Sequence, residues 1–100
     1  MKIEVEIEWE GKPAKVVLKR LTWGEANEII RKCIGKVKIV GNEPSSVSFD
    51  IVLWKEELLL KSLVEAPFPI TMEGIRGLPA ELGEKLYRKA EELNPFLKLF

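Results

Sequence analysis

The chain has 100 residues, of which 46% are hydrophobic and 32% charged, and its 16 basic residues balance its 16 acidic ones. This length and hydrophobic content are typical of one domain with a modest core, and they exclude a disordered chain. The balanced charge argues against the basic surface of a nucleic-acid binder or of a protein that adheres to anionic membranes.

The residue types present give almost no catalytic signal. The chain contains no histidine, which removes the commonest general base and the commonest metal ligand. Its single cysteine, Cys33, excludes an intramolecular disulfide and falls on an apolar stripe, so we expect a buried thiol. No signal peptide is visible, nor any apolar run of the ~20 residues that span a membrane. We therefore expect a cytoplasmic protein without catalytic residues, cofactor or metal; its Lys- and Glu-rich charge is typical of thermophiles.

Residues 2–21 predict a β-hairpin. In the first half, glutamate alternates with apolar side chains, which is the period of a strand with one buried face. Residues 10–13 contain a glycine and predict the turn. The return strand then places Lys15 and Lys19 opposite the glutamates of the first strand. Because an isolated hairpin is marginally stable, we expect its apolar face to pack on helices.

A helix is predicted over residues 23–34. Thr22 and Glu25, at the end of the hairpin, have the spacing of a capping box. Glu28 and Lys32 form a favourable i,i+4 pair on the outer face. The predicted apolar stripe consists of Trp23, Ala26, Ile30, Cys33 and Ile34. For residues 36–40 the pattern leaves helix and short strand open, and residues 41–46 predict a loop.

Residues 48–65 predict a second helix, which ends before Ala66 and Pro67. This helix is apolar on two sides, so it is either central in its domain or shared with another chain. One side carries Ile51, Trp54 and Leu58. The other is a wide arc that consists of Phe49, Val52, Leu53, Leu59, Leu60, Leu63 and Val64. Glu56 falls inside this arc, where we expect a lysine partner or, failing that, a raised pKa.

The C-terminal third predicts one helical turn at 71–76, stopped by Gly77, and a last helix over 79–93. Glu81 with Lys85, and Glu84 with Arg88, have the spacing of i,i+4 pairs in that helix. Asn94 and Pro95 end the helix, and an apolar tail follows at 96–100. The candidate partner-binding residues are therefore Ile51, Trp54, Leu58, Phe96, Leu97 and Phe100; for both groups the alternative is burial in the chain's own core.

Together these patterns predict a single α+β domain over residues 1–100, in which an N-terminal β-hairpin packs on about three α-helices. The element order and several short motifs resemble the small tail assembly chaperones of tailed bacteriophages and related proviruses. The matching positions are Thr22, Glu25, Asp50 and Pro79, and the resemblance extends from about residue 16 to 94. Members of that family are of similar length, bind the tape measure protein before the tail tube polymerises around it, and are not enzymes.

The resemblance implies a non-enzymatic adaptor that holds apolar segments of a partner protein, and self-association is also open. The alternative from a different class is a small regulatory nucleic-acid-binding protein that uses helix 23–34, on which Arg31 and Lys32 face outward. Neutral overall charge makes nucleic acid the weaker expectation. An enzyme comes third, and it requires a deep polar pocket around Glu56.

Overall fold

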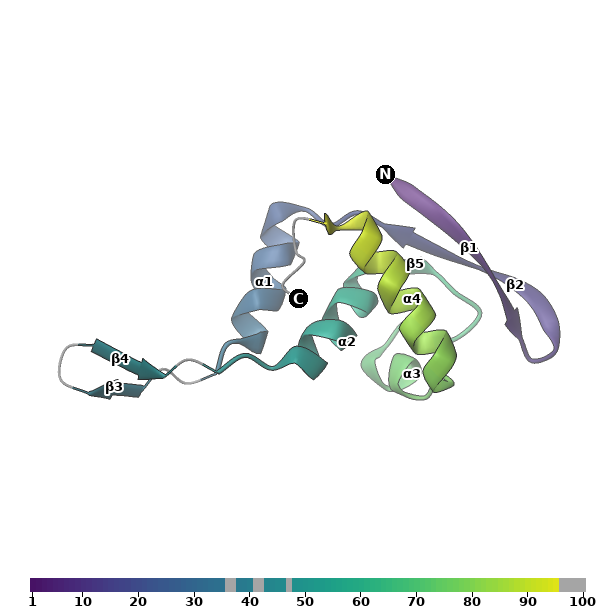
Figure 1. Cartoon of the computed structure of the whole chain (residues 1–100). Helices are drawn as coiled ribbons and strands as arrows, with labels where there is room; N and C mark the ends of the chain where they lie inside the picture. Colours follow the sequence, from purple (N-terminus) through teal and green to yellow (C-terminus); the bar gives the residue numbers. More distant parts are fainter. Residues whose placement is uncertain (36–37, 41–42, 47, 96–100) are drawn as a thin grey trace.

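The computed structural model describes residues 1–35, 38–40, 43–46 and 48–95, and it confirms the predicted α+β class. These residues form an N-terminal hairpin beside four helices, with a second β-ribbon at the far end of the molecule (Figure 1). The strands are β1 (Lys2–Trp9), β2 (Lys12–Lys19), β3 (Lys38–Val40), β4 (Glu43–Ser46) and β5 (Leu63–Glu65). The helices are α1 (Trp23–Cys33), α2 (Ile51–Ser62), α3 (Met72–Arg76) and α4 (Ala80–Leu93).

A two-residue turn joins β1 to β2 and closes at the pair Trp9 and Lys12. Both turn residues have positive φ, 52° at Glu10 and 77° at Gly11. Left-handed conformations at both positions are the type I′ geometry, whose twist matches that of the flanking strands. Glycine adopts this conformation freely, which is why the glycine in this stretch predicts the turn.

The sheet has a third strand that the sequence pattern does not predict. The helix expected over 48–65 ends at Ser62, and the next three residues form β5 on the open side of β2. Leu63 lies opposite Leu18, so backbone groups of β2 that face away from β1 find partners in β5. This pairing outweighs the helical period of the sequence, and the strand order is β1-β2-β5.

The capping box at the start of α1 is confirmed. The backbone N–H of Glu25 donates to Thr22 Oγ1 at 3.2 Å, and the N–H of Thr22 donates to the Glu25 carboxylate at 3.0 Å. Lys19 reaches the same carboxylate at 3.0 Å instead of a strand glutamate, whereas Lys15 lies 3.4 Å from Glu4 as predicted. The hydrogen bonds from Thr22 and Lys19 lower the pKa of Glu25.

α2 is the central element, as its two apolar sides predict. It contributes Leu59 to a cluster that lies under the sheet, and Trp54 and Leu58 to a cluster that lies under α1. Buried members of the first cluster are Val5, Ile7, Val16, Leu18, Leu59, Leu63, Phe68, Ile75, Leu78, Leu86 and Leu93. Buried members of the second are Leu21, Ala26, Ile29, Cys33, Trp54, Leu58 and Ala90. α2 and α4 contribute to both clusters and so connect the sheet to α1.

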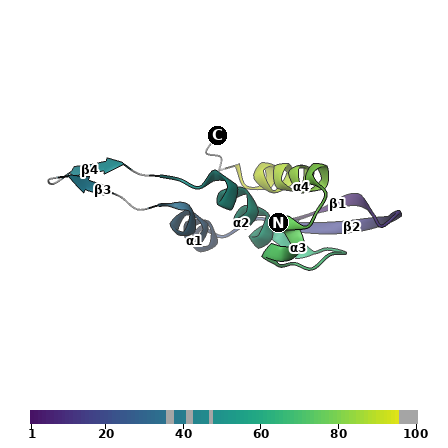
Figure 2. The same ribbon diagram turned by 90° about the horizontal axis from the view of Figure 1, so that it is seen from below.

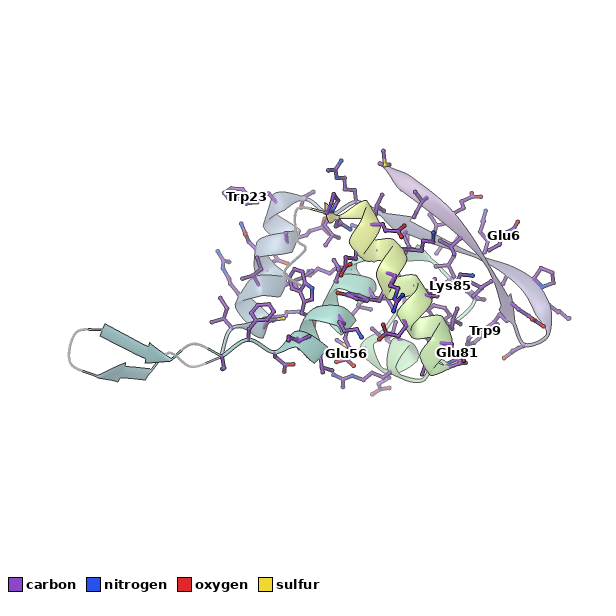
Figure 3. All side chains as sticks on the ribbon, viewed as in Figure 1. Glu6, Trp9, Trp23, Glu56, Glu81 and Lys85 are labelled. Carbon is purple, nitrogen blue, oxygen red and sulfur yellow. The ribbon has the colours of Figure 1, made fainter. Side chains whose placement is uncertain are left out.

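The buried face of α1 differs from the predicted stripe. Ala26, Ile29 and Cys33 are buried, but Trp23 is 80% exposed and Ile34 is 44% exposed. Trp23 is the first residue of the helix, and its side chain points away from the body of the protein (Figure 3). The prediction that Trp23 and Ile34 belong to the buried stripe is therefore wrong. The face of α1 that packs on α2 passes through Ile29, which the predicted stripe does not contain.

β3 and β4 form an antiparallel ribbon that projects from the end opposite the N-terminal hairpin (Figures 1 and 2). The strand alternative is thus the correct one for residues 38–40, and the loop predicted at 41–46 is wrong for Glu43–Ser46. Two hydrogen bonds close the base of the ribbon, from Gly35 N to Ser48 O at 2.8 Å and from Asp50 N to Cys33 O at 2.9 Å. The ribbon makes the molecule long, 59 × 27 × 20 Å.

Asn94 connects the end of α4 to the junction between β2 and α1. Its side chain is fully buried, with Oδ1 accepting from the backbone N–H of Leu21 and Nδ2 donating to the carbonyl of Ala90, both at 2.9 Å. Its own N–H donates to the carbonyls of Ala90 and Glu91 at 3.1 Å. The sequence identifies Asn94 as a helix stop, but its bond to a residue 73 positions away is a tertiary contact.

Candidate functional site

A groove lies between α2, α3 and α4 and has a volume of about 350 Å³. Its floor is apolar and comes from three elements of the fold, with Leu59 on α2, Ile75 on α3 and Leu78 just before α4. Val52 lines the groove from the first turn of α2 and is 66% exposed. α4 supplies the opposite wall, which includes Gly83 and Tyr87 and the N-cap residue Pro79. The groove therefore presents apolar surface to solvent.

Two ion pairs border the groove. Glu56 accepts two hydrogen bonds from the Arg76 guanidinium, from Nε at 2.5 Å and from Nη2 at 3.0 Å. Lys55 on α2 pairs with Glu84 on α4, and its Nζ lies 5.2 Å from the centre of the Tyr87 ring. Glu56 thus has a cationic partner, as expected, but an arginine from α3 in place of a lysine. Because the charges at the rim neutralise one another, they leave the apolar floor as the feature that a ligand meets.

Tyr87 forms part of the groove wall and keeps its phenol neutral. Its hydroxyl donates a 2.7 Å hydrogen bond to Glu91 Oε2, one turn further along α4. Burial, together with the hydrogen bond to Glu91, raises the pKa of Tyr87 to about 12. A neutral ring edge and a bonded hydroxyl add to the apolar character of the wall.

We expect the phenol of Tyr87 to titrate at about pH 12 in the folded protein and near its ordinary pKa of ~10 when the chain is unfolded. The chain has one tyrosine, so phenolate absorbance reports this group alone. Because the folded-state pKa is the higher one, the stabilisation is complete below pH ~10 and is lost as pH rises towards about 12. Tyr87→Phe should lack that loss. A phenol that titrates near 10 in the native protein would show that the wall is solvated.

The candidate partner-binding residues of α2 are only partly available at the surface. Trp54 and Leu58 are each 1% exposed, and the Phe49 ring lies tilted against Trp54 with centroids 5.9 Å apart. A surface built on Trp54 and Leu58 would require the second core cluster to open, so these two positions are corrected to core. Ile51 is 45% exposed. The exposed apolar residue beside it, Val52, belongs to the arc that the sequence assigns to the main apolar side.

The other candidates, Phe96, Leu97 and Phe100, lie outside the described residues.

The charges of α1 and α2 pair between the helices. Lys61 lies 2.9 Å from Glu28, and Lys32 lies 3.4 Å from Glu57. In both pairs a residue late in one helix meets one near the middle of the other, which is the arrangement of antiparallel helices. The first contact lowers the pKa of Glu28 and raises that of Lys61. The predicted Glu28–Lys32 pair is thus replaced by contacts across the interface, and Lys32 does not form a free basic patch with Arg31.

Charged side chains of α4 also contact other elements of the fold. Glu84 pairs with Lys55 of α2 in place of Arg88, and the ammonium of Lys85 donates to the backbone carbonyl of Glu6 at 3.4 Å in place of Glu81. Local i,i+4 pairs are worth only ~0.2–0.5 kcal/mol, so nearby partners on other elements displace them readily.

Among the described residues, no group of three or more His, Cys, Asp or Glu side chains could hold a metal ion. Burial, with Asp50 and Glu57 nearby, raises the pKa of the Cys33 thiol, which makes it a poor nucleophile. None of the helices that the structure describes is both long and apolar enough to cross a membrane. Comparisons of the chain with protein-family models, curated proteins and solved structures find no match.

Proposed function

We propose that this protein is a non-enzymatic adaptor that holds an apolar segment of a partner protein in the groove between α2, α3 and α4. The observation that carries this proposal is an apolar floor, bordered by self-neutralised ion pairs, with Val52 66% exposed beside it. A groove of this composition suits the apolar face of a helical segment. The resemblance to tail assembly chaperones supports the same class and suggests the tape measure protein as the partner.

The groove fits a protein ligand better than a reacting substrate. Of the two carboxylates that line it, Glu56 uses both of its oxygens to bind the Arg76 guanidinium, and Glu84 pairs with Lys55. The rest of the lining around Glu56 is mostly apolar. This composition differs from the deep polar pocket that we would expect of an enzyme. Burying one leucine-sized side chain of a partner contributes roughly 1.5–3 kcal/mol, so two or three anchors suffice for a weak, reversible complex.

We expect Val52→Glu to abolish the binding of a synthetic amphipathic helical peptide with leucines at i, i+3, i+4 and i+7. The substitution places an unpaired carboxylate beside the apolar floor, but Val52 is already 66% exposed, so stability should change by no more than ~0.5 kcal/mol. Binding is measured by isothermal titration calorimetry and stability by denaturant unfolding.

Ile51→Glu is the matched control, because Ile51 is the preceding residue of α2, is 45% exposed and does not line the groove. It should leave peptide binding intact. Equal loss in both variants, or unchanged affinity in Val52→Glu, would contradict the groove as the binding site. Retention on heparin that falls steeply with salt would instead favour the nucleic-acid alternative.

A further inference from the structure

β1 is an edge strand with one side of its backbone unpaired by the rest of the sheet. Among the residues that the structure describes, the strand order is β1-β2-β5, so β2 is the one strand that pairs with β1. In a hairpin with a two-residue turn, the two residues that flank the turn bond to each other through both their N–H and their C=O groups. Along the two strands away from the turn, every second pair of opposite residues does the same. The closing pair contains Trp9, and the carbonyl of Met1 accepts from Arg20 N at 3.0 Å, so the odd residues of β1 face β2.

The even residues of β1 therefore direct their N–H and C=O groups to the open edge. The hydrogen bond from Lys85 confirms this direction, because its ammonium reaches the carbonyl of Glu6 from α4 at 3.4 Å. Figure 3 shows Lys85 on the side of α4 that faces the hairpin. A lysine placed over an edge strand is a usual protection against unwanted strand pairing. Within the described part of the chain, the side chain that an incoming strand would have to displace here is the long, exposed one of Lys85.

Of the four even residues of β1, Lys2 is basic and the other three are glutamates. Glu4, Glu6 and Glu8 are all exposed, and of the three only Glu4 has an ion-pair partner among the described residues, Lys15 at 3.4 Å. Like charges on neighbouring strands are destabilising and opposite charges stabilising. A second copy of β1 alongside would place glutamates next to glutamates, which disfavours self-pairing. The edge is instead complementary to a strand that carries lysine or arginine.

A hollow at the end of β1 is also bordered by acidic side chains. It has a volume of about 470 Å³ and lies between the end of β1 and the start of α4. Trp9 and Leu82 give it an apolar base, and Glu8, Glu10 and Glu81 give it an acidic rim. Apolar side chains on one face of an added strand could rest on this base, while cations at its end meet the rim.

We propose that β1 binds an extended segment of a partner protein in which lysine or arginine alternates with apolar residues, and that this segment joins the sheet as a strand next to β1. Backbone hydrogen bonds from the even residues supply affinity, and the glutamate row supplies specificity for a basic sequence. The hollow beside β1 shares Pro79 with the groove between α2, α3 and α4, but no residue of β1 lines that groove.

The test uses the full chain and two synthetic peptides of eight residues, the length of β1. One alternates lysine with valine and threonine, and the other has glutamate at each lysine position. We expect the basic peptide to bind, with affinity that falls as salt rises, and to protect the amides of Glu4, Glu6 and Glu8 from hydrogen exchange. Equal binding of both peptides, or protection elsewhere, would overturn the proposal, as would a dimer that forms through β1.

Glu6→Pro tests the geometry, because it removes an edge N–H without removing a hydrogen bond to β2. Glu6→Pro should lower the affinity for the basic peptide at least about tenfold more than Glu6→Thr does. The threonine variant loses the same charge but keeps the N–H. The double variant Glu6→Lys, Glu8→Lys should reverse the preference to the acidic peptide, which keeps the proposal testable should the proline disturb folding. Val52→Glu should bind the basic peptide normally, which separates this surface from the groove.

Discussion

Trp54→Ala is expected to lower the free energy of unfolding by about 3–5 kcal/mol, the usual cost of truncating a large buried aromatic residue. Trp54 is 1% exposed and lies in the cluster that joins α1, α2 and α4. Its ring contacts Phe49, with centroids 5.9 Å apart. Alanine would leave a cavity in the middle of this cluster, because α2 and α4 are also anchored to the sheet by the first cluster and cannot collapse freely.

Trp23→Ala is the matched control for Trp54→Ala, since it removes the same side chain from a position that is 80% exposed. It should change stability by no more than ~0.5 kcal/mol. Both values come from denaturant unfolding, with an unchanged m value as the condition for comparing midpoints. Similar losses in the two variants would contradict the burial of Trp54 and would restore it as a surface residue.

The parts of the fold that follow from neighbouring residues could be predicted from the sequence. The capping box of Thr22 and Glu25 needs only residues three apart, and the turn at Gly11 needs only a glycine in a left-handed conformation. The hairpin and the start of α4 behind Pro79 rest on similarly local rules. Each of these features is stabilised by contacts within one or two turns of chain, so a local pattern contains the information that determines it.

Features that depend on distant residues could not be predicted in the same way. β5 forms because β2 has an open side, which the helical period of 48–65 cannot reveal. On α2, two apolar sides left the choice of buried side open, and the structure buries Trp54 but exposes Val52. The ion pairs between α1 and α2 depend on the antiparallel packing of the two helices, so the i,i+4 rule selects the wrong partners.

The candidate groove could not be predicted either, because it too depends on residues that are distant in the sequence. Its lining comes from three segments, 52–59, 75–80 and 83–87, which only the folded chain brings together. The nearest sequence signal was Glu56 inside an apolar arc, which indicated a carboxylate with an unusual environment. Glu56 does line one side of the groove, but the sequence predicted only a cationic partner or a raised pKa for it. Arg76 and the apolar floor required knowledge of where α3 and α4 pack.

Asn94→Ala is expected to lower the free energy of unfolding by about 1–3 kcal/mol, although the residue lies at the end of a helix. The reason is the backbone N–H of Leu21, which donates to Asn94 Oδ1 at 2.9 Å and is left without that acceptor in the variant. Leu21 is 5% exposed, so water is a poor replacement. Native-state hydrogen exchange should show the amide of Leu21 losing protection more than the helical amides of α4.

Asn94→Asp separates hydrogen bonding from packing, because a protonated carboxyl group can accept from Leu21 N and donate to Ala90 O as the amide does. Burial of the carboxyl raises its pKa in the folded state above the ordinary value of ~3.9 in the unfolded chain. Relative to wild type, stability should therefore be near normal below pH ~3.9 and should fall as pH rises through ~3.9 towards the folded-state pKa. Asn94→Ala should show a loss that does not depend on pH. A parallel pH dependence in the two variants, or a stable Asn94→Asp protein at neutral pH, would mean that the side chain at position 94 is solvated and does not bind the junction of β2 and α1.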